Sequence, residues 1–86
     1  MAHPLQPERW EAIRRIVRSR LQRNLPIDDE TPLISGGLID SMSIVGLILD
    51  LQGEFAVEIP ASEVHADNFD SVSKIGATVL RFLSVS

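Results

Sequence analysis

The chain contains no cysteine. Disulfides, zinc–thiolate sites and catalysis by a cysteine thiol are therefore excluded. No stretch is long and apolar enough to predict a transmembrane helix. The first seven residues also lack the basic flank and the apolar core of a secretory signal peptide. We therefore expect a cytoplasmic protein.

Cations are missing from the middle of the chain. Six of the eight basic residues lie between Arg9 and Arg23, and none lies between Asn24 and Ser73. Nucleic-acid binding depends on cations that neutralise phosphates, so we expect no nucleic-acid partner. An acidic surface favours partners with basic patches, and the plainer interpretation is a solvated surface. The acids of this stretch are Asp28, Asp29, Glu30, Asp40, Asp50, Glu54, Glu58, Glu63, Asp67 and Asp70.

What is present predicts one small domain with a single tight core, since 44% of the 86 residues are hydrophobic. Apolar residues at helical spacing predict a first helix from Pro7 to about Arg23, which Pro26 would stop. The connection from Leu25 to Asp40 holds two prolines and two glycines, and its scattered apolar residues predict packing onto the core. A loop this long in so small a domain is usually functional.

A second helix is predicted from near Ser41 to about Gly53. One side of it carries a core stripe, formed by Ile44, Leu47, Ile48, Leu51 and Phe55. The opposite side carries Met42, Val45 and Leu49, with Gly46 and Gly53 beside them. We interpret this second apolar stripe, with its small flanking positions, as a partner-docking surface. The alternative is a central core helix that leaves a hydrophobe or two exposed.

The remaining third of the chain predicts an extended segment over Phe55–Pro60 and a turn or short helix from Ala61 to about Ala66. Asp67–Asp70 is expected to be a connector. A last helix should begin near Ser71, capped by Asp70 or Ser71. Its apolar face comprises Val72, Ile75, Val79, Leu80 and Leu83.

Ser41 is the candidate functional residue, because it follows Asp40 at the point where the loop becomes a helix. A serine hydrolase would need a general base and an orienting acid near the serine. The two histidines lie in the N-terminal tail (His3) and in a predicted exposed turn (His65), and the Gly-x-Ser-x-Gly pattern is absent. We therefore interpret Ser41 as a modification site. A metal site built from Glu63, His65 and Asp67 is disfavoured against an ordinary acidic turn.

The run Gly37-Leu38-Ile39-Asp40-Ser41-Met42, followed by Glu54-Phe55 and Glu58-Ile59-Pro60, resembles the acyl and peptidyl carrier protein family. This resemblance implies an all-α, four-helix bundle with three main helices, one short helix and a long first loop. It also implies that Ser41 bears covalent 4'-phosphopantetheine and that Asp40 helps a phosphopantetheinyl transferase to recognise the site. The arm ends in a thiol that holds an acyl group as a thioester, and so supplies the thiol that the chain lacks.

Within that family, Asp40-Ser41-Met42 and Asn68-Phe69-Asp70-Ser71-Val72 look most similar to D-alanyl and other free-standing aminoacyl carriers. The resemblance implies a monomeric carrier without enzymatic activity. Its expected partners are the transferase, an adenylate-forming acyl or aminoacyl ligase and a downstream acyltransferase or synthase. The expected docking residues are Met42, Val45, Gly46 and Leu49. The runner-up is a small helical interaction module without a prosthetic group.

The same resemblance divides the chain into three parts. Residues 1–6 are expected to be a flexible tail and residues 7–83 the carrier domain. Residues 84–86 are expected to fray at the C-terminus.

Overall fold

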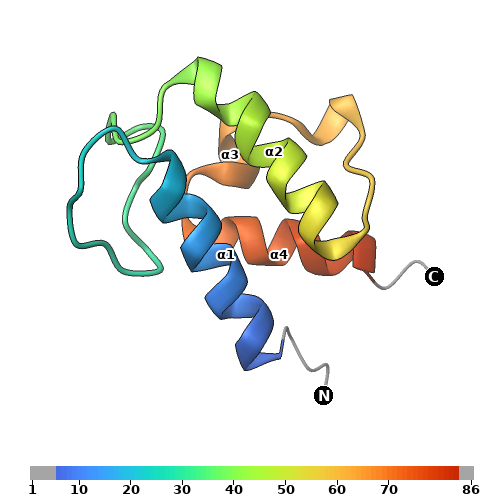
Figure 1. Cartoon of the computed structure of the whole chain (residues 1–86). Coiled ribbons are helices and arrows are strands. Elements are labelled where there is room, and N and C mark those ends of the chain that lie inside the picture. Colours follow the sequence, from blue (N-terminus) through green and yellow to red (C-terminus); the bar gives the residue numbers. More distant parts are fainter. Residues whose placement is uncertain (1–5, 84–86) are drawn as a thin grey trace.

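The computed structural model describes residues 6–83 of the 86-residue chain, so the expectations for residues 1–5 and 84–86 lie outside the described residues. The described part is all-helical, without a strand, as the sequence predicted. Its elements are α1 (Pro7–Arg20), α2 (Ser41–Phe55), the 3-10 turn η1 (Ala61–Glu63), α3 (Ala66–Phe69) and α4 (Val72–Leu83). Figure 1 shows how α1, α2 and α4 are arranged, with the long loop between α1 and α2 at one side.

The core draws on all four α-helices and on the long loop. Leu47 and Leu51 of α2 are fully buried, as predicted, whereas Phe55 is only partly buried at the end of that helix. Leu33 and Ile39 show that the loop packs onto the core, as its apolar residues predicted. The other buried apolar residues of this cluster are Ile13, Ile16, Val17, Ile48, Val57, Ile59, Phe69, Val72, Ile75 and Val79.

The first helix ends three residues earlier than the sequence predicted, at Arg20 and not near Arg23. Leu21 already has extended backbone angles, with φ −69° and ψ 140°. The backbone N–H of Gln22 donates to the carbonyl of Leu38 at 2.9 Å. A bond to the loop therefore replaces the next helical hydrogen bond, well before Pro26 is reached.

The predicted connector over Asp67–Asp70 is wrong, because α3 occupies most of it. The side-chain amide of Asn68 donates to the carbonyl oxygen of Glu63 at 2.8 Å, and Phe69 is fully buried. Thr78 of α4 donates to the carbonyl oxygen of Asn68 at 3.2 Å. A four-residue helix is too short to show a periodic pattern, and these tertiary contacts are what stabilise it.

The end of α2 and the start of α4 lie close to the positions that the sequence predicted. α2 continues two residues past the predicted end at Gly53 and stops where Ala56 takes a left-handed conformation, with φ 54°. α4 begins next to Ser71, whose hydroxyl oxygen accepts the N–H of Lys74 at 3.1 Å, as the predicted cap requires. No helix in the described part of the chain is long and apolar enough to span a bilayer.

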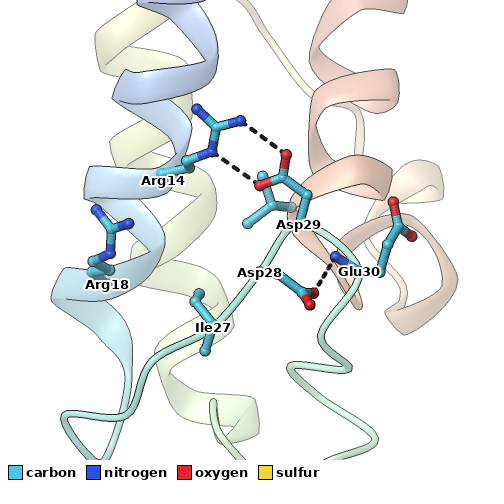
Figure 2. A pocket seen from close by; sticks show the side chains of 7 residues that line it. Arg14, Arg18, Ile27, Asp28, Asp29 and Glu30 are labelled. Carbon is cyan, nitrogen blue, oxygen red and sulfur yellow. Dashed lines mark hydrogen bonds and ion pairs between the residues drawn. The ribbon is translucent and has the colours of Figure 1, made fainter.

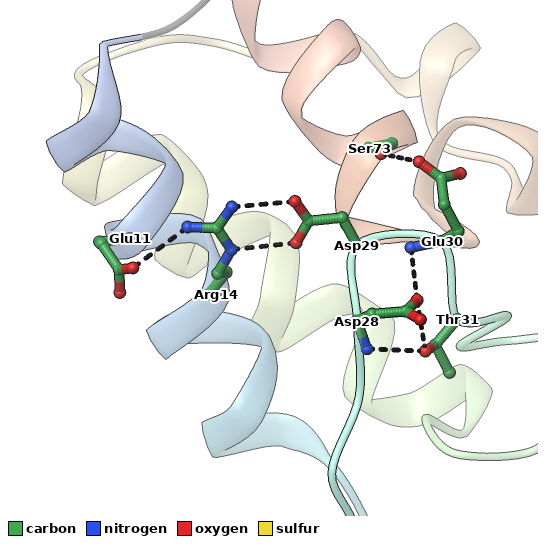
Figure 3. Close-up of polar contacts among 7 residues, drawn as sticks. All are labelled: Glu11, Arg14, Asp28, Asp29, Glu30, Thr31 and Ser73. Atoms are coloured by element: carbon green, nitrogen blue, oxygen red, sulfur yellow. Dashed lines mark hydrogen bonds and ion pairs between the residues drawn. The ribbon is translucent and has the colours of Figure 1, made fainter.

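Two aspartates, Asp29 and Asp70, make side-chain contacts that fasten the long loop. Asp29 makes a bidentate ion pair with Arg14 of α1, with both nitrogen–oxygen distances at 2.9 Å (Figure 3). Asp70 accepts the backbone N–H groups of Ile34 (2.7 Å) and Ser35 (2.9 Å) and the Ser35 hydroxyl (2.8 Å). These contacts hold the loop against α1 and α4, and so position the segment that leads into α2.

Candidate functional site

Ser41 is the first residue of α2 and its side chain is exposed, as the sequence predicted. Asp40 precedes it as the N-cap, in extended conformation with φ −85° and ψ 170°. Its Oδ1 atom accepts the backbone N–H of Ser43 at 2.8 Å. The cap stabilises the start of the helix and thereby presents the Ser41 hydroxyl to solvent at the positive end of the helix dipole.

The second oxygen of Asp40 is also engaged. Its Oδ2 atom accepts a hydrogen bond from Nε2 of Gln22 at 2.8 Å. The hydrogen bonds from Ser43, followed by the one from Gln22, lower the pKa of the Asp40 carboxyl below its usual value. Gln22 was not singled out from the sequence, because nothing in the sequence pattern links it to a residue eighteen positions away.

The second apolar stripe of α2 is exposed, as predicted. The exposed fractions of Met42, Val45 and Leu49 are 83%, 61% and 60%, whereas Leu47 and Leu51 on the opposite side are buried. We call Met42, Val45 and Leu49 the α2 apolar face. It begins one residue after Ser41 and is free of charged residues of α2.

Gly46 was expected to be a small position beside this stripe. The structure adds that the guanidinium of Arg20 lies over it. A Cβ atom at residue 46 would come within 2.8 Å of Nη2 of Arg20, and closer still to its Cζ and Nη1 atoms. Gly53, by contrast, does face open space.

Arg20 is held in this position by Asp50, one turn further along α2. Its Nε and Nη2 atoms both lie 3.0 Å from Oδ2 of Asp50. A second ion pair, between Arg15 and Glu54 at 3.2 Å, joins the same two helices. Arginines of α1 therefore line one edge of α2. Sequence patterns could not predict this, because each pair joins residues at least thirty positions apart.

The other candidate sites gain no support. Residues 6–83 contain no cluster of three metal-ligating side chains, and His65 lies 3.3 Å from the side-chain nitrogen of Asn68. An open hollow of about 460 Å³ lies between α1 and the loop, and its lining includes Arg18 and Ile27 (Figure 2). Arg14, in the wall of this hollow, pairs with Asp29, and all three of its guanidinium nitrogens are engaged by Asp29 and Glu11, so none is left for a ligand.

Comparison with known proteins shows the family of this chain. The family described as "Phosphopantetheine attachment site" matches residues 11–79. The D-alanyl carrier protein of Leuconostoc citreum (strain KM20) is 40% identical over 53 residues, which is 62% of this chain and 65% of that protein. That of Lacticaseibacillus casei (strain BL23) is 47% identical over 47 residues, which is 55% of this chain and 58% of that protein.

A third relative, the D-alanyl carrier protein of Lacticaseibacillus rhamnosus, is 39% identical over 59 residues, covering 69% of this chain and 68% of that protein. The chain spans less than two thirds of the length of the first two relatives. The family match nevertheless extends from α1 into α4 and so covers the whole helical core. The chain therefore belongs to the phosphopantetheine attachment-site family, whose members are non-catalytic carriers with covalently bound 4'-phosphopantetheine.

Proposed function

We propose that Ser41 is the residue that bears the 4'-phosphopantetheine, through a phosphodiester to its Oγ atom. The observation that carries this proposal is the exposed Ser41 hydroxyl at the first position of a fifteen-residue helix. A helix N-terminus favours the negative charge of a phosphate. The only acid next to Ser41 is Asp40, whose two oxygens are bonded to Ser43 and Gln22.

The group would supply a terminal thiol that holds a carboxylic acid as a thioester. We propose that the acid is an amino acid and that D-alanine is the first candidate, because the relatives are named D-alanyl carrier proteins. The proposed partners are a phosphopantetheinyl transferase, an adenylate-forming ligase that loads the arm, and an acyltransferase or synthase that unloads it.

The α2 apolar face is the proposed docking surface for these partners. An exposed row of hydrophobic residues gives the isolated domain little stability, and contiguous apolar patches on small proteins commonly mark interaction sites. Each partner must also approach Ser41 to act on the arm. The face starts beside Ser41, so a partner seated on it would have the arm within reach.

The attachment site is tested by incubating the protein with coenzyme A and a broad-specificity phosphopantetheinyl transferase, followed by intact-mass measurement. Wild-type protein should gain the mass of one phosphopantetheine group, and Ser41→Ala should gain none. Ser62→Ala is the control, since it removes the hydroxyl of another exposed serine, in η1, and should be modified normally. Modification of Ser41→Ala would refute the site. An unmodified wild type would favour the interaction module without a prosthetic group.

A further inference from the structure

A glycine in the middle of α2 requires an explanation. Gly46 lies five residues inside a fifteen-residue helix, where glycine is a poorer helix former than alanine. The space that an alanine methyl would need is filled by the guanidinium of Arg20. The glycine is therefore what allows Arg20 to lie flat across the helix.

Stability alone does not account for this arrangement. Arg20 and Asp50 are about one third exposed, at 35% and 37%. Exposed ion pairs of this kind typically add little to the stability of a protein. This gain does not exceed the helix propensity lost at Gly46, so the folded domain would be no less stable with alanine there.

The position of the guanidinium relates it to the α2 apolar face. At about 100° per residue, Gly46 lies roughly 40° around the helix from Met42 and roughly 60° from Leu49. Asp50 lies on the other side of Gly46 around the helix. Its carboxylate therefore binds Arg20 on the side away from the α2 apolar face. Nε and Nη2 face this carboxylate, whereas Nη1 has no hydrogen-bond partner among residues 6–83. The free nitrogen thus lies at the edge of the apolar face.

We propose that Arg20 is a specificity-determining residue of the docking surface and binds a carboxylate of the ligase that loads the arm. This inference rests on the proposed function, because it assumes that the ligase docks on the α2 apolar face. That face has no charged residue of α2, so apolar contacts with Met42 and Leu49 would leave the orientation of the ligase poorly defined. One cation at its edge specifies the orientation and attracts an acidic partner group. The stretch from Asn24 to Ser73, which includes α2, holds ten acids and no Lys or Arg, so a cation beside the α2 apolar face has to come from another part of the chain.

The first test measures D-alanine loading of the phosphopantetheinylated protein. The probe is the ligase that charges the D-alanyl carrier protein of Lacticaseibacillus casei, with ATP and D-alanine. Arg20→Gln should lower kcat/KM at least about fivefold, mainly through KM, and should flatten its dependence on salt. Arg15→Gln is the matched control. It removes the same charge and also breaks an α1–α2 ion pair, but Arg15 pairs with Glu54 on the side of α2 away from the apolar face.

The second test moves the guanidinium without removing it. Gly46→Ala places a methyl group where Arg20 lies, and the flexible arginine must shift. Its thermal midpoint should not fall, because alanine is the better helix former, yet loading should fall as in Arg20→Gln. The double variant should be loaded no more slowly than the slower single variant, because both substitutions remove the same contact between Arg20 and the ligase.

The outcomes separate this inference from the function on which it rests. If wild-type protein is loaded and both Arg20→Gln and Gly46→Ala match it, the role of Arg20 is refuted and the carrier function stands. An equal defect in Arg15→Gln would also refute it, since the effect would then be one of net charge. If phosphopantetheinylated wild type accepts no D-alanine, the proposed aminoacyl function fails and the docking contact with this ligase fails with it.

Discussion

Gln22 and Asp40 are joined by a 2.8 Å hydrogen bond, from the side-chain amide of Gln22 to the second carboxylate oxygen of the residue before Ser41. The backbone of Gln22 also bonds to Leu38, two residues before Asp40. Gln22, the second residue past the end of α1, thus holds the start of α2 through its side chain and through its backbone. With its other oxygen on the N–H of Ser43, the Asp40 carboxylate is kept in one orientation.

Gln22→Ala should slow the attachment of phosphopantetheine to Ser41, because Asp40 would be free to rotate while remaining charged. The thermal midpoint should change little, since the bond is exposed. Transferase kinetics with coenzyme A would measure the effect as a lower kcat/KM. In an Asp40→Asn background the substitution should have almost no further effect, because the group that it positions is gone.

Gln52→Ala is the control for this prediction. The side-chain oxygen of Gln52 accepts the N–H of Ile59 at 2.9 Å, so its removal also deletes a glutamine hydrogen bond, but away from Asp40. It should leave Ser41 modification at the wild-type rate. If both variants slowed modification equally, the effect would come from general destabilisation and the positioning role of Gln22 would be wrong.

Leu49→Asp should leave the fold intact and impair loading by the ligase. Leu49 is 60% exposed, so the substitution removes little packing, but it would bury a charge in an apolar contact with a partner. Loading kinetics at varied carrier concentration should show a raised apparent KM. Ala77→Asp adds the same charge at an exposed position of α4 and should load normally. Wild-type loading by Leu49→Asp would eliminate the docking role.

Leu51→Ala should destabilise the domain by about 2–5 kcal/mol, since it leaves a cavity at a fully buried position. That is a large share of the stability of a domain of this size. Urea denaturation would measure the loss. Leu49→Ala, on the exposed side of the same helix, should change the free energy of unfolding by less than about 0.5 kcal/mol. Equal losses in the two variants would mean that the apolar face is buried.

Asp70 should contribute to the loss of stability in acid. The hydrogen bonds that it accepts from Ser35 and Ile34 lower the pKa of its carboxyl in the folded state. The unfolded chain therefore binds a proton more readily. The stabilisation is fully present above the usual aspartate pKa of about 3.9, and it is lost as the pH falls through the lower folded value. Asp29, whose pKa Arg14 lowers, adds to the same trend.

Urea denaturation at several pH values between neutrality and pH 2.5 would test this. Asp70→Asn should be less stable than wild type at pH 7, because the bonds to the loop weaken, and should lose less stability on acidification. Asp67→Asn, on the neighbouring α3, is the control and should keep the wild-type acid dependence. Parallel curves for Asp70→Asn and wild type would show that the Asp70 carboxylate does not couple folding to pH.

The sequence alone determined the features that depend on near neighbours in the chain. Apolar spacing located α1, α2 and α4 and separated the buried from the exposed side of α2. The residues around Asp40 and Ser41 placed the start of α2, because an N-cap bonds to an N–H only three residues away. The resemblance carried by the same residues gave the family, which the match over residues 11–79 confirmed.

Only the tertiary structure decided the features that depend on distant residues. The early end of α1 follows from the bond between Gln22 and Leu38, and α3 exists because contacts with Glu63 and Thr78 stabilise a helix too short to form alone. The position of Arg20 over Gly46 requires two helices to pack against each other. The physical reason is range: periodicity and caps act over three or four residues, whereas these contacts join residues between five and thirty positions apart.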